Sequence, residues 1–487
     1  MSISSTLSNA LSGLTVAGRS ADVVSSNIAN AMTEGYGVRR LEIASRVTGN
    51  AGSGAQIGGI LRTEDMVLLG QRRLADAELS ALGTEAGFMT RLETLIGTPD
   101  QSGSLSARLA DFEATLTAAA NSPHSQAHLS AAVEAAAALA GQINTISDGI
   151  QAERLQADTA IARAVDTING ALGQIADLNT RIRAAQDGGG EAASLIDAQN
   201  ALVEEIAPFI PLQARRDSSG ALYLYSQDGE ALVDGQAAQL GFTPVAVMAP
   251  DMTRADGTLS GLTINGRNLR LDGTPPALAG GELAALFAVR DAWGTDAQAR
   301  IDAVARDLAE RLQAPGLDTT LPSGAAGLFT DAGAPVTAAA EIGLAGRLRL
   351  NAAVDPDQGG VVWRLRDGLG AATEGAIGNA TFLTAQLDAL SELRPTASGG
   401  FSGAARSLSG LVSDHLSLAG LARQTAETNE SHASARQSAL KQAELAAGVD
   451  TDAEMQRLLQ IEQVFAANAR VVQTAEAMLD ELMRIGA

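Results

Sequence analysis

The segment LLQIEQVFAANARVVQTAEAMLDEL (residues 458–482) carries apolar side chains at alternating steps of three and four residues. This spacing puts one residue of each turn on a common helix face, and the segment contains no proline. At about 1.5 Å per residue the face is about 36 Å long, and nothing on its own helix covers it. The segment therefore predicts a helix that packs against a partner. The members of this C-terminal seam are Leu458, Ile461, Phe465, Asn468, Val472, Ala475, Leu479 and Leu482.

The first thirty residues follow the same rhythm. Heptad-like stripes also occur on ordinary core helices, but both of these reach the three to four heptads that favour a coiled coil. The N-terminal stripe is rich in small residues and the C-terminal one in large residues, which suits close pairing. We predict that the two ends pair, with Asn468 either setting the register or merely tolerated. The N-terminal seam consists of Ile3, Leu7, Ala10, Leu14, Ala17, Ala21, Val24 and Ile28.

Length and composition limit the possible classes of protein. A chain of 487 residues exceeds the size of one hydrophobic core, so two or more units are expected. The net charge of −22 argues against nucleic acid or an anionic membrane as a partner. The chain has no cysteine, no basic and apolar secretory signal, and no apolar run long enough to span a bilayer. These rules alone predict a cytoplasmic protein.

The pattern along the chain predicts long helices interrupted by a region of short strands. Asn121-Ser122-Pro123 predicts a helix that begins with proline in its first turn. Segment 50–59 is rich in glycine and serine, and we expect it to be irregular or hairpin-like. The expected helices cover 1–32, 64–96, 104–120, 123–187, 282–312, 376–394, 406–446 and 452–485. The expected strands cover 222–225, 262–264, 269–271, 346–350 and 361–365, with a tight turn at Asn265-Gly266.

The predicted fold is mainly α with a smaller β-rich part (α+β). Its terminal helices pair as an α-helical coiled coil, and a body of long helices carries a short-stranded β insertion. The corresponding domain plan has three parts. Residues 1–32 and 452–487 form a terminal assembly domain, residues 33–205 and 282–451 form the helical-bundle body with short strands, and residues 206–281 form the β-rich insertion.

The sequence contains few residue patterns that are typical of catalytic sites. His124 and His128 lie four residues apart on a predicted helix, but the glutamate that a metalloprotease helix carries between them is absent. The sole lysine, Lys441, does not follow a phosphate-binding glycine loop, and no serine lies in a Gly-x-Ser-x-Gly elbow. Adjacent carboxylates such as Glu204-Glu205 and Asp480-Glu481 are expected to be solvated. The sequence therefore predicts no catalytic, cofactor-binding or metal-binding residue, and no enzyme.

Three short strings near the N-terminus resemble the signature of the bacterial flagellar rod, hook and hook-associated proteins. They are Leu11-Ser-Gly-Leu14, Ser25-Ser-Asn27-Ile-Ala-Asn30 and Thr33-Glu-Gly35-Tyr36. The C-terminal segment from Gly448 to Asp480 is similar to the matching end of the same family. Because long helices follow the N-terminal strings, the resemblance favours a hook-associated subunit of the hook–filament junction over a hook or distal rod subunit.

The resemblance implies an extracellular structural protein of the flagellum that leaves the cell by type III export without a cleavable signal. It implies self-assembly into a ring, contact with the hook protein and with a second hook–filament junction protein, and an export chaperone on the C-terminal helix. It implies neither nucleic acid nor membrane as a partner. The assembly residues would be Leu7, Leu14, Asn27, Ile28, Asn30, Gly35, Tyr36, Leu458, Ile461, Phe465, Asn468, Val472, Leu479 and Leu482.

Two alternatives remain at this point. One is another flagellar axial subunit, such as the hook or distal rod protein. The other is a flagellum-associated peptidoglycan hydrolase, which would need a catalytic carboxylate in a cleft.

Overall fold

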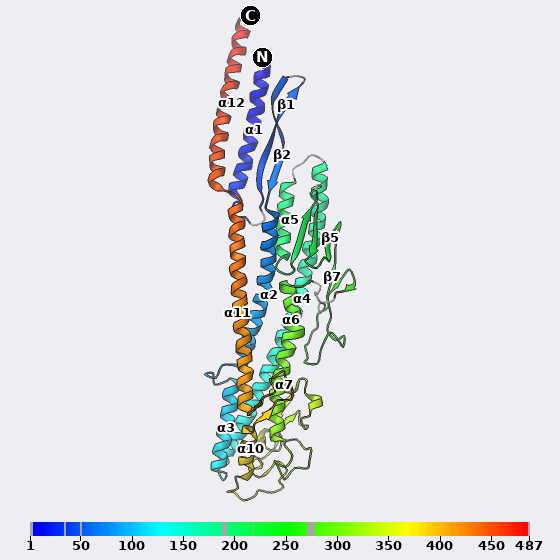
Figure 1. Ribbon diagram of the computed structural model, residues 1–487, viewed down its shortest axis with the longest axis vertical. Helices are drawn as coiled ribbons and strands as arrows, with labels where there is room; N and C mark the ends of the chain where they lie inside the picture. The colour runs from blue at the N-terminus through cyan, green and yellow to red at the C-terminus, as the bar shows by residue number, and fades with distance from the viewer. Residues whose placement is uncertain are drawn as a thin grey trace.

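The computed structural model describes residues 3–33, 36–48, 51–187, 192–217, 219–269 and 278–485. The molecule is a long rod of helices with both chain ends at the same tip (Figure 1). At that tip stand helix α1 (Ile3–Ala29), helix α12 (Thr451–Ile485) and the strands β1 (Val38–Thr48) and β2 (Ala51–Thr63). We call these elements the terminal unit, the remainder the body, and the zone where they meet the neck. The prediction of a mainly α protein with a smaller β part is confirmed.

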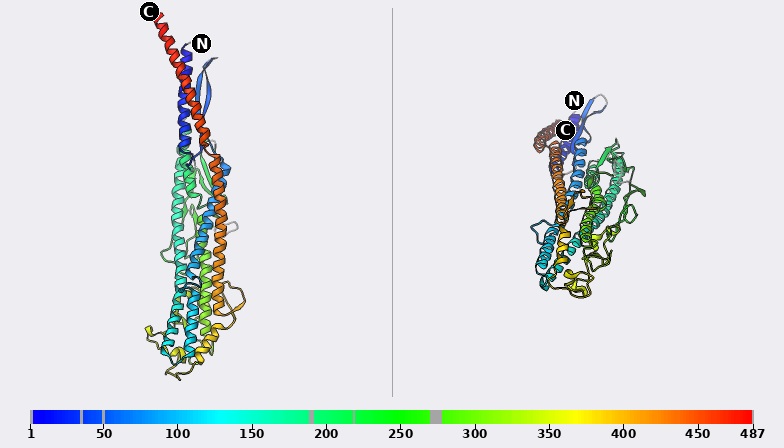
Figure 2. Two further views of the ribbon diagram at one scale, coloured as in Figure 1. Left: turned by 90° about the vertical axis from the view of Figure 1, so that its left-hand side faces the viewer. Right: turned by 60° about the horizontal axis from the view of Figure 1, so that its bottom comes forward.

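Helices α1 and α12 lie side by side and run in opposite directions, as the left-hand view in Figure 2 also shows. Helix α1 descends from the tip to the neck, and α12 rises from the neck to the tip. Below the neck, α2 (Met66–Ile96) and α11 (Leu408–Ala447) form a second antiparallel pair that continues the first. The rod is therefore built around two stacked helix pairs.

The hairpin of β1 and β2 is longer than the sequence suggested. Its strands pair antiparallel from Val38 with Thr63 to Thr48 with Ala51, with a register shift after Glu42. The expectation of an irregular or hairpin-like segment over 50–59 covered most of β2 but missed β1 altogether. The glycines of β2 concealed the strand, because glycine in a strand usually indicates a bulge or a close backbone approach rather than a regular run.

The body consists of long helices packed along the rod. Its longest described element is the 62-residue helix α4. Helix α2 has Asp65 as its N-cap, and the carboxylate of Asp65 accepts hydrogen bonds from the backbone amides of Val67 and Leu68. Apart from α2 and α11, the principal helices of the body are α3 (Leu105–Asn121), α4 (Gln126–Asp187), α5 (Ala193–Ile206), α6 (Gly281–Ala288), α7 (Gly294–Leu312) and α10 (Thr381–Ser391).

The spacing of residues in the sequence predicts a seam along the second half of α4, and this seam forms part of the hydrophobic core. Its members are Ile161, Val165, Ile168, Leu172, Ile175, Asn179 and Ile182. Its seven residues are all buried, and they include Ile161, Ile168 and Ile175 with no exposed surface. The helix does not begin with proline, however. Pro123 lies in a turn before Gln126, and the hydroxyl of Ser125 accepts a hydrogen bond from the amide of His128 at 3.3 Å. The expected stop at residues 188–190 lies outside the described residues.

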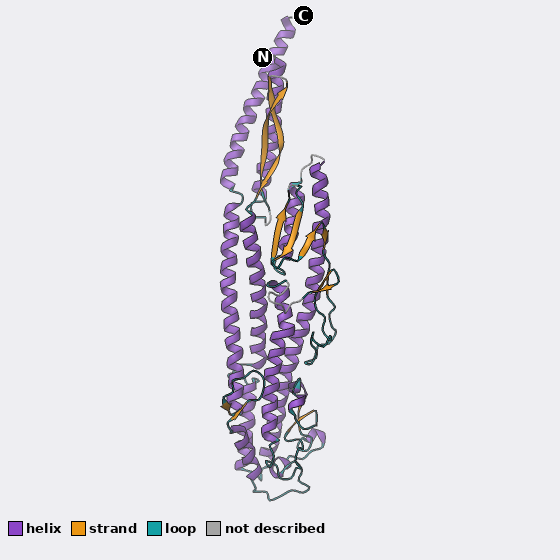
Figure 3. Ribbon diagram, turned by 45° about the vertical axis from the view of Figure 1, so that its right-hand side comes forward, coloured by secondary structure: helices purple, strands orange, loops and turns teal. Residues whose placement is uncertain are grey.

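The β part of the body consists of small antiparallel sheets beside α4 and α5 (Figure 3). Within the described ranges, the larger sheet has the order β3-β4-β5-β6, and a second has the order β7-β8-β9. The Asn265-Gly266 turn joins β8 to β9 as predicted. The expected strand 269–271 ends earlier, at Asn268, and residues 270 and 271 lie outside the described residues. The strands are β3 (Leu212–Arg216), β4 (Leu222–Ser226), β5 (Ala231–Asp234), β6 (Gln236–Ala237), β7 (Leu240–Gly241), β8 (Thr263–Ile264) and β9 (Arg267–Asn268).

Further along the chain, one strand prediction is confirmed and one is wrong. Strand β11 (Leu348–Leu350) pairs with β10 (Phe329–Asp331), within the predicted 346–350 segment. The segment 361–365 is not a strand, because a turn leads there into the short helix α9 (Arg364–Asp367). The buried Arg366 in α9 donates to the carbonyl of Pro123 at 3.1 Å and pairs with Asp367 at 2.6 Å. These contacts hold the segment in a helical turn against the start of α4.

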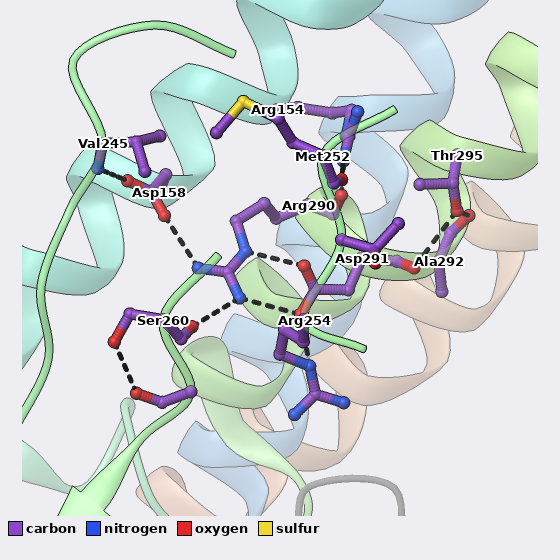
Figure 4. Close-up of polar contacts among 12 residues, drawn as sticks. Arg154, Asp158, Val245, Met252, Arg254, Ser260, Arg290, Asp291, Ala292 and Thr295 are labelled. Carbon is purple, nitrogen blue, oxygen red and sulfur yellow. Dashed lines mark hydrogen bonds and ion pairs between the residues drawn. The ribbon is translucent and has the colours of Figure 1, made fainter. Parts of the chain in front are cut away.

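Buried arginines attach the irregular segments of the body to its helices (Figure 4). Arg154 of α4 donates to the carbonyls of Arg290 at 2.8 Å and Met252 at 2.9 Å. Arg290 pairs with Asp158 at 2.7 Å, with no side-chain exposure at either residue, and donates to the carbonyl of Ser260 at 2.9 Å. A guanidinium carries five donors in a planar fork, so one side chain can satisfy several loop carbonyls at once. Buried arginines thus contribute to the packing of the loops of the body against its helices.

His415 of α11 should make the stability of the body depend on pH. Burial, with a smaller contribution from the charge of Arg300, lowers the pKa of His415 from 6.5 to about 4. Protonation is then disfavoured in the folded state, so stability present above pH 6.5 is lost as the pH falls toward 4. The shift corresponds to about 3 kcal/mol in the free energy of unfolding.

We expect His415→Leu to weaken this acid destabilisation, since neither ring nitrogen of His415 has a hydrogen-bond partner in the described structure. Denaturant unfolding at pH 7 and near pH 4.5 would measure the difference. The matched control is His432→Leu, at an exposed position on the same helix, which should keep the wild-type dependence. Equal loss of stability in His415→Leu and wild type would contradict the prediction.

Candidate functional site

The contact between α1 and α12 is centred on a residue without a side chain. A Cβ atom placed on Gly13 of α1 would lie 2.7 Å from the side-chain nitrogen of Asn468 and 2.8 Å from its oxygen. The amide of Asn468 also donates to the carbonyl of Val464 in its own helix at 3.0 Å. Asn468 therefore fills the space left by the missing side chain of Gly13. This contact aligns α1 with α12 at these two residues.

The position of Gly13 against Asn468 sets the register along the pair. Because the helices are antiparallel and rise equally, Ile3, ten residues before Gly13, lies about level with Met478, ten residues after Asn468. Helix α12 continues from there to Ile485 without a described residue of α1 beside it, and Figure 1 shows it projecting beyond α1.

Some residues of the predicted C-terminal seam are covered by α1, and others are exposed. Asn468 and Val472 are partly buried and Ala475 is only 4% exposed, so this part of the seam faces α1. Phe465 is 47% exposed, and the remaining seam residues toward the tip, Leu479 and Leu482, are also exposed. One neighbouring helix therefore covers only part of the apolar surface of α12.

A second apolar stripe runs beside the seam and was not identified in the sequence. Its members follow one another at seven-residue intervals, which places them on a common line along a helix. All four are exposed: Val464, Val471, Met478 and Ile485. With Phe465 and Leu479 they form a continuous uncovered strip, which we call the open stripe.

The lower end of the open stripe borders a groove of about 540 Å³ in the terminal unit. Helix α1 forms its floor, and α12 and β1 form its walls. The lining is largely apolar, with charged side chains at Arg39, Arg40, Glu454 and Arg457. The apolar lining includes Val16, Ala17, Val24, Leu41, Ile43 and Ile461.

The turn from α1 into β1 is held by the buried side chain of Asn27. Its amide nitrogen donates to the carbonyl of Arg39 at 2.8 Å, and its oxygen accepts from the amide of Arg39 at 3.0 Å. The same oxygen accepts from the hydroxyl of Tyr36 at 2.9 Å. The Asn27 side chain thus makes the two hydrogen bonds to the backbone of Arg39 that a neighbouring strand would make. It therefore fixes the position of the start of β1 relative to α1.

The other predicted motif residues lie around this turn. Asn30 donates to the carbonyl of Ser26 at 2.9 Å, and the guanidinium of Arg39 stacks 4.9 Å from the ring centre of Tyr36. Gly35 lies outside the described residues. Leu7, Leu14 and Ile28 are partly buried along α1.

Ion pairs at the neck connect the terminal unit to the body. Arg39 of β1 and Arg62 of β2 both pair with Asp197 of α5, the latter through Nε at 2.9 Å. Because both strands reach the same carboxylate, the base of the hairpin is attached to the body at one point.

A second cluster joins α2, α5 and α11 just below the neck. Glu204 accepts from Arg73 Nε at 2.9 Å and also pairs with Arg72, which in turn pairs with Asp76 and Glu444. Although burial alone lowers the pKa of Arg72, the attraction of Glu204, Asp76 and Glu444 raises it above its ordinary value. Burial raises the pKa of Glu444, and the charge of Arg72 opposes that shift. The prediction that Glu204 is solvated is therefore wrong.

The sequence missed this cluster because its members are far apart in the chain. A helical spacing of four residues relates Arg72 to Asp76, but nothing in the sequence relates either of them to Glu204 or Glu444.

Within the described ranges there is also no group of three or more histidine, aspartate or glutamate side chains that could hold a metal ion. No described helix combines the length and apolar character that crossing a membrane requires.

Comparison with known proteins gives two family matches. Residues 89–326 match the flagellar hook-associated protein FlgK helical domain, and residues 442–485 match the flagellar basal body rod FlgEFG protein C-terminal family. The second match covers the whole of α12 and the last residues of α11.

Individual relatives carry related names. The flagellar hook-associated protein 1 of Escherichia coli is 26% identical over 327 residues, covering 62% of this chain and 58% of the relative. That of Salmonella typhimurium is 29% identical over 313 residues, covering 59% and 55%. The chain therefore spans just over half the length of these relatives. The solved flagellar hook junction protein FlgK of Burkholderia pseudomallei aligns with 54% of this chain and 46% of its own, at 23% identity and a TM-score of 0.44.

We expect Gly13→Ala to weaken the pairing of α1 with α12, because the added methyl group would overlap Asn468. Overpacking of this kind costs about 1–3 kcal/mol. The rate of trypsin cleavage after Arg470, in the exposed part of α12, should rise and would measure the opening of the pair.

Gly18→Ala is the matched control, since a Cβ at Gly18 of the same helix meets nothing within 4 Å. It should leave cleavage unchanged or slow it, because alanine favours helix over glycine. Adding Asn468→Ala to Gly13→Ala should restore part of the loss. Equal cleavage rates in the two glycine variants would contradict the proposed contact.

Asn27→Ala should loosen the turn between α1 and β1. It removes three hydrogen bonds and leaves buried backbone groups of Arg39 unpaired, each at a cost of about 1–3 kcal/mol. Amide exchange at Arg39 should accelerate by at least about tenfold, the equivalent of 1.4 kcal/mol. Asn30→Ala, which loses contacts with Ser26 and Thr33 but none with Arg39, should change this rate little. Unchanged exchange at Arg39 in Asn27→Ala would contradict the role assigned to Asn27.

Proposed function

We propose that this chain, which belongs to the flagellar hook-associated protein 1 family, is a structural subunit of the bacterial flagellum that joins the hook to the filament. The family follows from the helical-domain match over 89–326, the rod-protein match over 442–485 and the relatives named above. The observation that carries the proposed role is the terminal unit, where paired end helices leave the open stripe of α12 uncovered.

Uncovered apolar surface of this extent suits assembly. Monomeric soluble proteins rarely expose long contiguous apolar patches, and such patches commonly mark interaction sites. In α12 the exposed residues continue over the full length of the helix, so a partner of similar length is needed to cover them. Neighbouring subunits in a ring or tube would supply such partners.

We infer that the terminal helices, residues 1–32 and 452–487, act as the assembly domain together with the hairpin that follows α1, with residues 64–205 and 282–451 as the body and 206–281 as an insertion. The hairpin over 38–63 lies with the terminal helices rather than with the body. In this proposal the interface uses the residues named from the sequence, with Leu479, Leu482 and Phe465 facing other subunits and Asn468 facing α1.

The proposed partners are further copies of this chain, the hook protein and a second hook–filament junction protein. Before export, a chaperone would cover the C-terminal helix, since the open stripe would otherwise favour aggregation. Helix α12 is accessible for this purpose along most of its length. The protein would then act outside the cell, after export without a cleavable signal. Neither nucleic acid nor membrane enters the proposal.

The alternative functions are less well supported. A hook or distal rod subunit does not account for the match to a hook-associated helical domain over 89–326. A peptidoglycan hydrolase is not favoured either, because the relatives reported above are flagellar hook-associated proteins, which are structural proteins rather than enzymes.

Loss of this chain should leave cells with hooks that carry no filaments, visible by electron microscopy. Ile461→Asp should reproduce that defect when it replaces the wild type, because it places a charge between α12 and α1. The purified variant should keep the unfolding transition of the body. Gln463→Asp adds the same charge at an exposed position two residues away and should support normal filaments. Filaments of normal number on cells with Ile461→Asp would contradict the proposed role of the seam.

A further inference from the structure

Two surfaces of the terminal unit complement each other but lie too far apart on one chain to meet. The first is the groove between α1, α12 and β1, which is lined by Ile43, Ile461 and Val464 among others. The second is the end of α12, residues 478–485. The 14 to 21 residues of rigid helix between Val464, on the groove wall, and this end span about 20–30 Å. The end of α12 therefore cannot enter the groove of its own chain.

The end of α12 has the character of a segment that binds in an apolar groove. Met478, Leu482 and Met483 are 54%, 55% and 76% exposed, and Leu479 and Ile485 are exposed as well. Amphipathic helices commonly bind by placing such residues, three, four and seven positions apart, into a groove. No described part of α1 lies beside this end, so no described residue of α1 covers it.

The charges of the two surfaces are also complementary. The groove carries Arg39, Arg40, Arg457 and the buried Glu454, whereas the end of α12 carries the exposed Asp480, Glu481 and Arg484. Arg39 pairs with Asp197 and Arg457 with Glu454, so the exposed Arg40 is the groove cation that best suits the two carboxylates of the α12 end. Opposite charges at the rim of an apolar contact select the partner and fix its register.

The groove itself contains an unpaired carboxylate oxygen. Glu454 is only 3% exposed and accepts from Arg457 through Oε1, but its Oε2 has no hydrogen-bond partner in the described structure. A buried acceptor without a donor is costly, and an occupant that brings a positive charge near it would reduce that cost. Arg484, on the end of α12, could supply this charge.

We propose that the end of α12 of one copy, residues 478–485, binds in the groove of a second copy. The contact is heterologous, since two different surfaces meet, and such contacts repeat from copy to copy into rings or helical assemblies. The two copies would be offset along the rod by about 20–30 Å, the distance between the groove and the end of α12. This inference rests on the self-assembly part of the proposed function and identifies which surfaces make it.

The chain has no cysteine, so introduced thiols test this contact without background. Ile43→Cys lines the groove and Met483→Cys lies on the end of α12. The two single variants would be expressed together in cells that lack the wild-type chain, and the isolated flagella would be oxidised mildly. We expect a disulfide-linked dimer that neither variant forms alone.

The control pairs Met483→Cys with Leu61→Cys, which is exposed on the same hairpin but does not line the groove. The groove pair should give at least about tenfold more dimer, since thiols held together react far faster than thiols that meet by chance. Equal yields would overturn the proposal. So would a dimer of Ile43→Cys with Leu11→Cys, because α1 of the second copy would then occupy the groove.

Charge exchange provides a test that needs no thiol. Asp480→Arg with Glu481→Arg should prevent junction formation, and Arg40→Glu, at an exposed position of the groove, should restore it at least in part when added to the same chain. No restoration, together with no groove dimer, would overturn this contact. Normal filaments on cells that lack the chain altogether would instead overturn the proposed function, so the two failures are distinguishable.

Discussion

The close approach of α1 and α12 depends on the absence of a side chain at Gly13. Asn468 occupies the space where a Cβ would lie, and this match brings the first and last helices of the chain into contact. Because α1 and α12 are in contact, the segment between them starts and ends at the neck, and it forms the body of the rod. Helices α2 and α11 carry the chain away and back as an antiparallel pair directly below the terminal unit.

Charged groups join the parts of this rod at the neck and hold its loops against the helices. At the neck, Asp197 holds both strands of the hairpin and Glu204 holds two arginines of α2. In the body, Arg154 and Arg290 hold loop carbonyls against α4 (Figure 4). Breaking one partner of such a buried pair is costly because it leaves the other charge without compensation. These pairs therefore fix how the elements meet, while the helix stripes supply the apolar burial.

The sequence predicted the features that depend on local periodicity. The seam of α4 and the paired ends could be read from it because the spacing of apolar residues survives in the linear chain. Features that depend on distant partners could not. Glu204 looks solvated beside Glu205, and only the fold brings Arg72 and Arg73 to it. The strand expected over 361–365 became a helical turn because Arg366 is held by the carbonyl of Pro123, far away in the sequence.

The candidate site shows the same limit on a smaller scale. The seam of α12 was predicted as one surface, but one partner helix covers only one side of it, so Ala475 is buried and Phe465 is not. The line of Val464, Val471, Met478 and Ile485 has a seven-residue spacing and could have been found in the sequence. Asn27 was identified through the motif, but its hydrogen bonds to both backbone groups of Arg39 required the structure.

We propose that α12 carries one apolar side covered by its own α1 and another covered only in the assembly. Labelling of single cysteines with maleimide, in the free chain and in isolated flagella, tests it directly. Val471→Cys should react fast in the free chain and slowly in flagella, whereas Ala475→Cys should react slowly in both. Equally fast labelling of Val471→Cys in flagella, or fast labelling of Ala475→Cys in the free chain, would contradict the account.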